Sequence, residues 1–451
     1  MKSWTKTPLT MLLAVMSLVN CSAQVPECEK LVRRTERVIA SIQHSHDKAN
    51  ALLILGKAIA ATDSSMDQTF VPEVQGVLSS LPDQPKWWLR ETARILAELS
   101  LVESHYSLSE AVELAKQAVD VGRSYSEKER DVYLPPSFFS SIGLVLIKGS
   151  EHDTLEAAVS TAANPRQARL WVAEALYEYG MKQHALTILD SVYQDLLRKP
   201  QPIARLVWFA APFARCGELE RALTLLELVS ESSGVVSATV ISTQYYKVAR
   251  DASKSQAAED SRKIIERIAE KMRSLTAEDQ IGKAFLLINL ANTHALLNRK
   301  AESRELCEAA RKYATEAVKR KMSNSTTRVI LLLEVANCIP SEEKKERQKV
   351  IRQALEEFQD YPANQIPSTE YVVEKLGKIC AIAEAKSLVA NSHTFERDRG
   401  RAALSQILVR NGRLEEAYAV IGEIEAPMEQ AKGLAAMIKA VCGEAKDKEQ
   451  N

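Results

Sequence analysis

The sequence predicts an all-α protein, an α-solenoid of stacked antiparallel helical hairpins. Two observations support this prediction. At three places where one apolar helix gives way to another, a glycine is followed five positions later by an alanine. The 451-residue composition also favours helix over sheet, because helix-forming residues dominate and only 6% of residues are aromatic. A single core rarely grows to this length, so we expect two domains or one elongated array.

The glycine-to-alanine spacing has a physical reason at each end. Glycine suits a turn that needs a positive φ just after a helix C-terminus. Alanine suits a point where two helices cross too closely for a larger side chain. The three copies are Gly180-Met-Lys-Gln-His-Ala185, Gly217-Glu-Leu-Glu-Arg-Ala222 and Gly412-Arg-Leu-Glu-Glu-Ala417.

Proline marks the start of the opening helix in two of these hairpins. Pro165 and Pro202 each lie fifteen residues before the glycine, and proline is favoured in the first helical turn. We therefore expect one helix from each proline to the next glycine. A weaker copy of the turn, without glycine, lies at Leu296–Ala301. Such hairpins cannot bury their apolar faces alone, so they are expected to stack.

At these residues the chain resembles the tetratricopeptide-repeat (TPR) proteins. In that family a glycine closes the first helix and an alanine five residues later lies in the second. A small residue stands twelve positions before the alanine, here Ala173, Ala210 and Ser405. The family's earlier tryptophan is out of register, and its closing proline is not regular. The resemblance implies a TPR-like superhelix that binds protein or peptide segments on a concave surface and catalyses no reaction.

The pattern also predicts an order of regions along the chain. Composition shifts and paired prolines mark the expected breaks. The regions are a signal peptide at 1–23, N-terminal helical repeats at 24–130, an irregular connecting region with short helices at 131–164, central TPR-like repeats at 165–359, a linker at 360–368, C-terminal TPR-like repeats at 369–445 and a polar tail at 446–451.

The first 23 residues predict export. Lys2 and Lys6 precede an apolar run at 9–19 that is too short to span a membrane. A lipoprotein signal with acylation of Cys21 is the alternative, and a retained anchor or the absence of a signal is the third possibility. We therefore expect a secreted, periplasmic or cell-envelope protein, and we identify no later membrane-spanning segment.

Charge and cysteine content narrow the partners and the chemistry. The whole chain has 59 basic and 59 acidic residues. Removal of the two lysines with the signal leaves 57 basic and 59 acidic residues, a net charge near −2. This neutrality argues against binding of nucleic acid.

Six cysteines follow the signal. Their wide spacing favours buried free thiols over a disulfide framework, although their even number permits disulfides. They are Cys28, Cys216, Cys307, Cys338, Cys380 and Cys442.

No catalytic, cofactor-binding or metal-binding motif stands out, so we expect neither an enzyme nor a cofactor. Trp87 and Trp88 form either a platform for a ligand or, as is more common for such residues, part of the hydrophobic core. Trp171 and Trp208 occupy near-equivalent repeat positions, which indicates a packing role.

The leading hypothesis is an exported, non-catalytic scaffold that binds a protein or peptide in a concave groove. Residues on the opening helices are the candidates for partner binding, together with Trp87 and Trp88. An α/α-toroid protein that binds or processes carbohydrate is the alternative, and the oligomeric state stays open. The groove candidates are Arg169, Glu174, Tyr177, Arg205 and Arg215.

Overall fold

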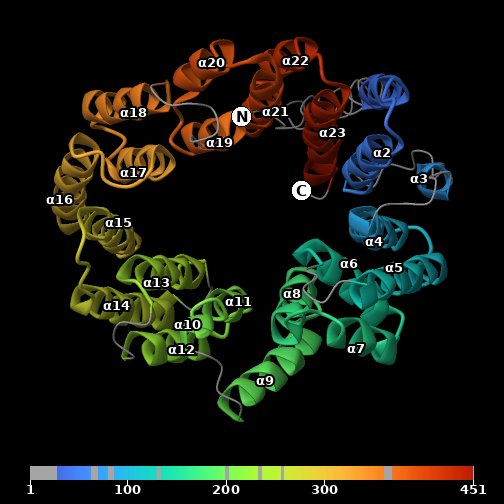
Figure 1. Ribbon diagram of the computed structural model, residues 1–451, viewed down its shortest axis with the longest axis horizontal. Helices are drawn as coiled ribbons and strands as arrows, with labels where there is room; N and C mark the ends of the chain where they lie inside the picture. The colour runs from blue at the N-terminus through green and yellow to red at the C-terminus, as the bar shows by residue number, and fades with distance from the viewer. Residues whose placement is uncertain are drawn as a thin grey trace, which may run out of the picture. The chain divides into compact units, whose positions relative to one another are not determined.

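The protein is all-helical throughout the part of the chain that the structure describes, which confirms the predicted α-solenoid of TPR-like hairpins (Figure 1). The computed structural model describes residues 28–61, 70–79, 86–128, 134–198, 203–231, 236–254, 258–359 and 368–449. The signal peptide predicted at 1–23, with Cys21, and almost all of the linker predicted at 360–368 lie outside these residues. None of the described helices is long and apolar enough to cross a membrane.

The chain forms two compact units. One unit contains residues 122–368 with 378–380, and the other combines 1–121 with 369–377 and 381–451. The second unit thus brings both ends of the chain together. The regions predicted from the sequence are each continuous in the chain, so they do not include a unit built from N-terminal and C-terminal segments.

The unit formed by residues 122–368 consists of helical hairpins that pack in chain order. Its helices are α6 (Pro136–Lys148), α7 (His152–Ser160), α8 (Pro165–Glu178), α9 (Lys182–Arg198), α10 (Ile203–Leu206), α11 (Ala210–Arg215), α12 (Leu219–Glu231), α13 (Ala238–Ala252), α14 (Ala258–Ser274), α15 (Gln280–Leu296), α16 (Lys300–Lys319), α17 (Ser325–Cys338) and α18 (Lys344–Gln359).

The other unit consists of N-terminal and C-terminal helices. A helix at 28–40 precedes the first of the labelled elements. The others are α2 (Ser45–Ala60), α3 (Phe70–Ser79), α4 (Lys86–Glu103), α5 (Leu108–Lys128), whose last residues belong to the first unit, and α19 (Thr369–Lys378), α20 (Ile382–Ala390), α21 (Thr394–Arg410), α22 (Leu414–Gly422) and α23 (Pro427–Glu449). The last helix therefore continues into the predicted polar tail at 446–451.

The three glycine turns have the left-handed backbone that favours glycine. The φ angles are +80° at Gly180, +82° at Gly217 and +69° at Gly412. In each turn the residue after the glycine donates its backbone N–H to the carbonyl of the residue five positions earlier, at 2.8 to 2.9 Å. This is the hydrogen bond of a Schellman motif, which satisfies a carbonyl that the helix end leaves unpaired. The alanines five residues later are fully buried: Ala185, Ala222 and Ala417.

The same turn recurs where the sequence has no glycine. Ser150, Asn298 and Cys380 have φ angles of +60°, +59° and +57°. The residues after them make the equivalent backbone hydrogen bond, at 2.7 to 3.0 Å. The left-handed residue of the α15–α16 turn is therefore Asn298, so the register predicted at Leu296–Ala301 was wrong by two positions, and Ala301 is exposed.

The helix predicted from Pro202 to Gly217 is interrupted. The structure has α10, a turn at 207–209 and then α11. Pro212 lies in α11 and has no N–H to donate to the carbonyl four residues earlier, which belongs to Trp208. The missing hydrogen bond and the steric clash of the proline ring account for the break at this point.

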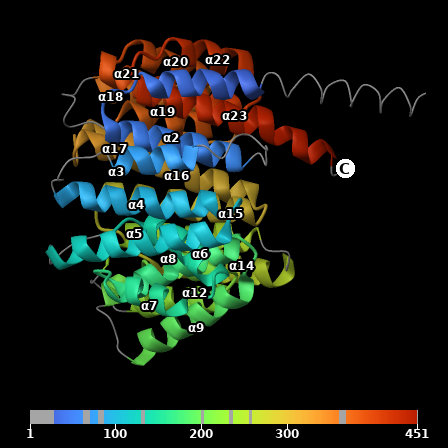
Figure 2. The same ribbon diagram turned by 90° about the vertical axis from the view of Figure 1, so that its right-hand side faces the viewer.

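The expectation that all six cysteines are free thiols was wrong for one pair. Cys28 and Cys442 form a disulfide, with their Cα atoms 5.7 Å apart and 414 positions separating them in the sequence. The bond joins the helix at 28–40 to α23 within one unit, and α2 also packs against α23 (Figure 2). Sequence spacing gave no sign of this pair, because only the fold brings the two ends together. Four of the described cysteines are free: Cys216, Cys307, Cys338 and Cys380.

Candidate functional site

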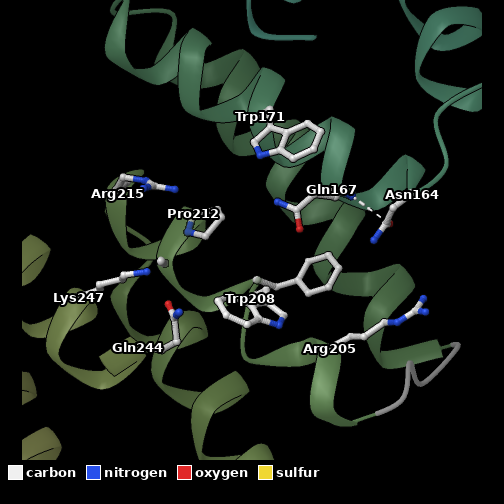
Figure 3. A pocket seen from close by; sticks show the side chains of 11 residues that line it. Asn164, Gln167, Trp171, Arg205, Trp208, Pro212, Arg215, Gln244 and Lys247 are labelled. Atoms are coloured by element: carbon white, nitrogen blue, oxygen red, sulfur yellow. Dashed lines mark hydrogen bonds between the residues drawn. The ribbon is translucent and has the colours of Figure 1, made fainter. Parts of the chain in front are cut away.

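A pocket of about 540 Å³ lies on the first helices of three successive hairpins, α8, α10–α11 and α13. Polar, cationic and aromatic side chains line it (Figure 3). We call it the Trp208 pocket. Its lining residues are Asn164, Gln167, Trp171, Arg205, Trp208, Phe209, Ala211, Pro212, Arg215, Gln244 and Lys247.

Two indole rings border the pocket. Trp208 lies in the turn between α10 and α11 and is 53% exposed, a large value for so big an apolar side chain. Trp171 is half-buried on α8 and stacks on Phe139 of α6, with ring centroids 5.8 Å apart. The predicted packing role was therefore wrong for Trp208. The break before Pro212 takes its ring out of the helical register that Trp171 occupies.

Among the described residues, three cations line the pocket and no acidic side chain does. Arg215 donates from Nε to Glu174 Oε1 of α8 at 3.0 Å and also from Nη2. The side chains of Arg205 and Lys247 make no hydrogen bond or ion pair with the described part of the chain. Burial lowers the pKa of Lys247, the nearby charges of Arg215 and Arg250 lower it further, and the carboxylate of Asp251 opposes this shift in part. The net effect is a lowered pKa, so the surroundings disfavour the positive charge of Lys247.

The pocket also contains amide side chains. Gln244 is only 2% exposed, and its side-chain amide has no hydrogen-bond partner among the described residues. Asn164 is different, because its side-chain oxygen accepts from the backbone N–H of Gln167 at 3.2 Å and so caps α8. Gln244 therefore offers a donor and an acceptor that the protein leaves unused.

The structure brings together only some of the predicted groove residues. Arg205 and Arg215 line the pocket, and Glu174 borders it through its ion pair with Arg215. Arg169 instead pairs with Glu156 of α7 at 2.8 Å. Tyr177 points toward the α11–α12 turn, since a Cβ atom at Gly217 would lie 3.1 Å from its hydroxyl.

The paired tryptophans belong to the other unit. Trp88 is half-buried on α4, and the side chain of Trp87 lies outside the described residues. Sequence reasoning missed Gln167, Gln244 and Lys247 as pocket residues. Gln244 and Lys247 lie three apart on α13, a spacing that places two side chains on one helix face. The same spacing occurs in every helix, so it could not identify these residues as part of a pocket.

Burial shifts the pKa values of two titratable groups around the pocket. Burial raises the pKa of Glu174, and the guanidinium of Arg215 opposes this rise. Burial also raises the pKa of the Cys216 thiol to about 12, which keeps it protonated and unreactive near neutral pH. No group of three or more His, Cys, Asp or Glu side chains in the described ranges is placed to hold a metal ion.

Comparisons with known proteins give distant structural likenesses. No protein family and no curated protein matches the chain. The listed solved structures include Ton1535 from Thermococcus onnurineus NA1, with a TM-score of 0.28, 15% identity, and coverage of 92% of this chain and 99% of that one.

Two others have similar coverage. One is a Rap protein in complex with Competence and Sporulation Factor, with a TM-score of 0.29, 11% identity, and coverage of 86% of this chain and 99% of that one. The other is a circular tandem repeat protein with novel repeat topology, with a TM-score of 0.21, 14% identity, and coverage of 94% and 99%. At these scores the likenesses do not bear on function, so the functional case rests on the pocket.

Proposed function

We propose that this protein is an exported, non-catalytic helical-repeat scaffold that binds protein or peptide segments at the Trp208 pocket. The observation that carries the proposal is the exposed indole of Trp208 beside two cations and a buried amide that lack partners among the described residues. An aromatic or arginine side chain that is exposed in a recessed surface is the usual kind of anchor at a protein interface.

The position of the pocket supports a polypeptide ligand. Its residues come from the first helices of three successive hairpins, so an extended segment that crosses these helices contacts each in turn. Most of the lining side chains are on these helices, and Trp208 lies in the short turn between α10 and α11. A preformed surface loses less conformational entropy on binding. A volume of about 540 Å³ accommodates a few side chains of a partner.

The residue types support binding without catalysis. The lining side chains are aromatic, amide and cationic, whereas hydrolysis of a glycan requires a pair of carboxyl groups across the cleft. Glu174, the acidic residue paired with Arg215, is occupied by that ion pair. These groups orient and hold a ligand but provide no nucleophile and general base together.

Export is supported by the disulfide and by the predicted signal peptide. Disulfides persist in secreted, periplasmic and surface proteins and are rare in the cytosol. Cys28 lies only a few residues after the predicted cut at Gln24. Intact-mass measurement of the protein from the secreted and envelope fractions tests this. A chain that begins at Gln24 supports secretion, an acylated Cys21 supports the lipoprotein alternative, and an uncleaved chain in the cytosol contradicts export.

A direct binding measurement tests the scaffold. The full chain is immobilised and probed with a synthetic library of twelve-residue peptides, in parallel with Trp208→Ala and Leu228→Ala variants. Leu228 is 41% exposed on α12, a helix that contributes nothing to the pocket, and serves as the matched control. We expect peptide binding that Trp208→Ala abolishes and Leu228→Ala preserves. Binding that is equal in both variants contradicts the proposed site.

Carbohydrate binding is the second candidate, because indole faces also stack on sugar rings and amides hydrogen-bond to hydroxyl groups. The observation that favours it is the combination of Trp171 and Trp208 with Gln167 and Gln244 in one pocket. A glycan array probed with the same variants distinguishes the two, since retention of a glycan but of no peptide replaces the peptide proposal.

A further inference from the structure

We infer that the Trp208 pocket selects an acidic peptide segment, whose carboxylate lies between Arg215, Lys247 and Gln244 and whose neighbouring apolar side chain lies on Trp208. This inference rests on the proposed function and adds the chemistry of the ligand. It comes from the charge, the unpaired amide and the order of groups across the pocket.

The charge of the lining is the first argument. The described lining of the pocket contains three cations and no acid, in a chain whose overall charge is zero. Glu174 compensates Arg215 alone. Burial lowers the pKa of Lys247, and the charges of Arg215 and Arg250 lower it further, while the carboxylate of Asp251 offsets only part of this shift. A carboxylate placed here removes this repulsion and replaces water lost from a half-buried ammonium group.

The buried amide is the second argument. Gln244 lies three residues before Lys247 on α13, and its amide has no partner in the described part of the chain. A peptide supplies both halves of what this amide requires. Its carboxylate or backbone carbonyl accepts from Nε2, and its backbone N–H donates to Oε1. A simple anion satisfies only the donor.

The arrangement of the groups is the third argument. Figure 3 shows Arg215, Lys247 and Gln244 on one side of the pocket and Arg205 on the opposite side, with Trp208 between them. The indole of Trp208 therefore separates the two cationic sides of the pocket. A polyuronate or a nucleic acid carries a charge on every unit and would place one of them over the indole. A peptide alternates charged and apolar side chains, which matches this order.

The experiment compares acidic peptides with their amide counterparts. Twelve-residue peptides that contain Asp or Glu beside an apolar residue are synthesised, together with versions in which Asn or Gln replaces each acid. Binding is measured by titration with the full chain and with Lys247→Gln, Arg205→Gln and Lys263→Gln variants. Lys263 lies on α14 with a 66% exposed side chain, outside the pocket, and is the control of equal charge.

We expect the wild-type chain to prefer the acidic peptides about tenfold or more over their amide versions, because hydrogen bonds to charged groups are worth more than neutral ones. Lys247→Gln should abolish this preference, Lys263→Gln should keep it, and higher salt should reduce it. Thermal unfolding followed by circular dichroism establishes that each variant is folded. Arg205→Gln, at the opposite side of Trp208 from the proposed carboxylate site, should keep most of the preference. If Lys247→Gln does not fold, Lys247→Met, which removes the same charge and keeps an unbranched side chain, carries the same test.

The outcomes separate this inference from the proposed function. Peptides that bind at the pocket equally well with acids and with amides overturn the inference and leave the scaffold intact. Failure of all peptides to bind, with retention of a polyuronate that Trp208→Ala abolishes, overturns both and indicates a glycan ligand. Preference for acids that Lys247→Gln leaves unchanged also overturns the inference, since the recognition then lies elsewhere.

Discussion

Reduction of the Cys28–Cys442 disulfide is expected to destabilise the unit that contains both ends of the chain. The bond closes a loop with a sequence separation of 414 residues. The chain-entropy relation for cross-links gives a ceiling of roughly 6 kcal/mol for a loop of this length, and measured effects seldom exceed about 5 kcal/mol. A loss of about 4 kcal/mol lowers the melting temperature of a unit of this size by on the order of 10 °C.

Non-covalent contacts determine what remains after reduction. The guanidinium of Arg34, on the helix at 28–40, lies 4.4 Å from the ring centroid of Tyr418 on α22. Helix α2 packs against α23 as well. We therefore expect the reduced protein to stay folded at 25 °C and to melt at a lower temperature, rather than to unfold when the bond breaks.

Thermal unfolding measured by circular dichroism, with and without dithiothreitol, tests this expectation. Cys442→Ser should reproduce the melting temperature of the reduced protein and should no longer respond to reductant. Cys380→Ser is the matched control, because Cys380 is exposed and free. Equal melting temperatures for the oxidised and reduced wild-type protein, with the bond verified by mass, would refute the reasoning about loop closure.

Three further predictions concern single residues. Burial and a hydrogen bond with Glu110 raise the pKa of Glu103 to about 7. Because the folded state therefore binds this proton more tightly than the unfolded state, the free energy of unfolding should fall as pH rises from about 4.5 to 7. Urea unfolding should show Glu103→Gln gaining stability relative to wild type at pH 8 and little at pH 4, and a gain independent of pH counts against this. Cys380→Gly should stabilise the chain by up to ~1 kcal/mol and Gly412→Ala should destabilise it by a similar amount, because both positions are left-handed; the same sign in both melts contradicts the turn geometry. Ala222→Leu should cost about 1–3 kcal/mol by overpacking, since Ala222 is fully buried, and an unchanged denaturation midpoint would argue against a close helix crossing.

The repeat architecture could be predicted because a turn imposes a local requirement on one residue. Positive φ after a helix end favours glycine, so Gly180, Gly217 and Gly412 mark their turns in the sequence itself. Ser150 and Cys380 adopt the same backbone without glycine, and there the sequence gives no local signal. Tertiary packing of the hairpins stabilises these turns despite their side chains.

The site was harder to predict because it depends on a break in one helix and on side chains that separate helices bring together. Arg205 and Arg215 were identified from their helix, but Arg169 and Tyr177, on a neighbouring opening helix, face other partners. The exposure of Trp208 follows from the break before Pro212. That proline could have indicated the break, since it removes a hydrogen bond from the helix interior. The partnerless amide of a buried glutamine such as Gln244 is evident only in three dimensions.

Site-specific photo-crosslinking tests the central claim most directly, that the Trp208 pocket binds a polypeptide partner. A benzophenone amino acid is introduced at Gln167, on the pocket wall, and in a second variant at Leu228, which is exposed on α12 outside the pocket. We predict that the position-167 variant crosslinks to one polypeptide partner, that an excess of an acidic peptide prevents the crosslink, and that the position-228 variant does not crosslink to it. Equal crosslinking from both positions, or crosslinking from position 228 alone, would contradict the assignment of the pocket as the binding site.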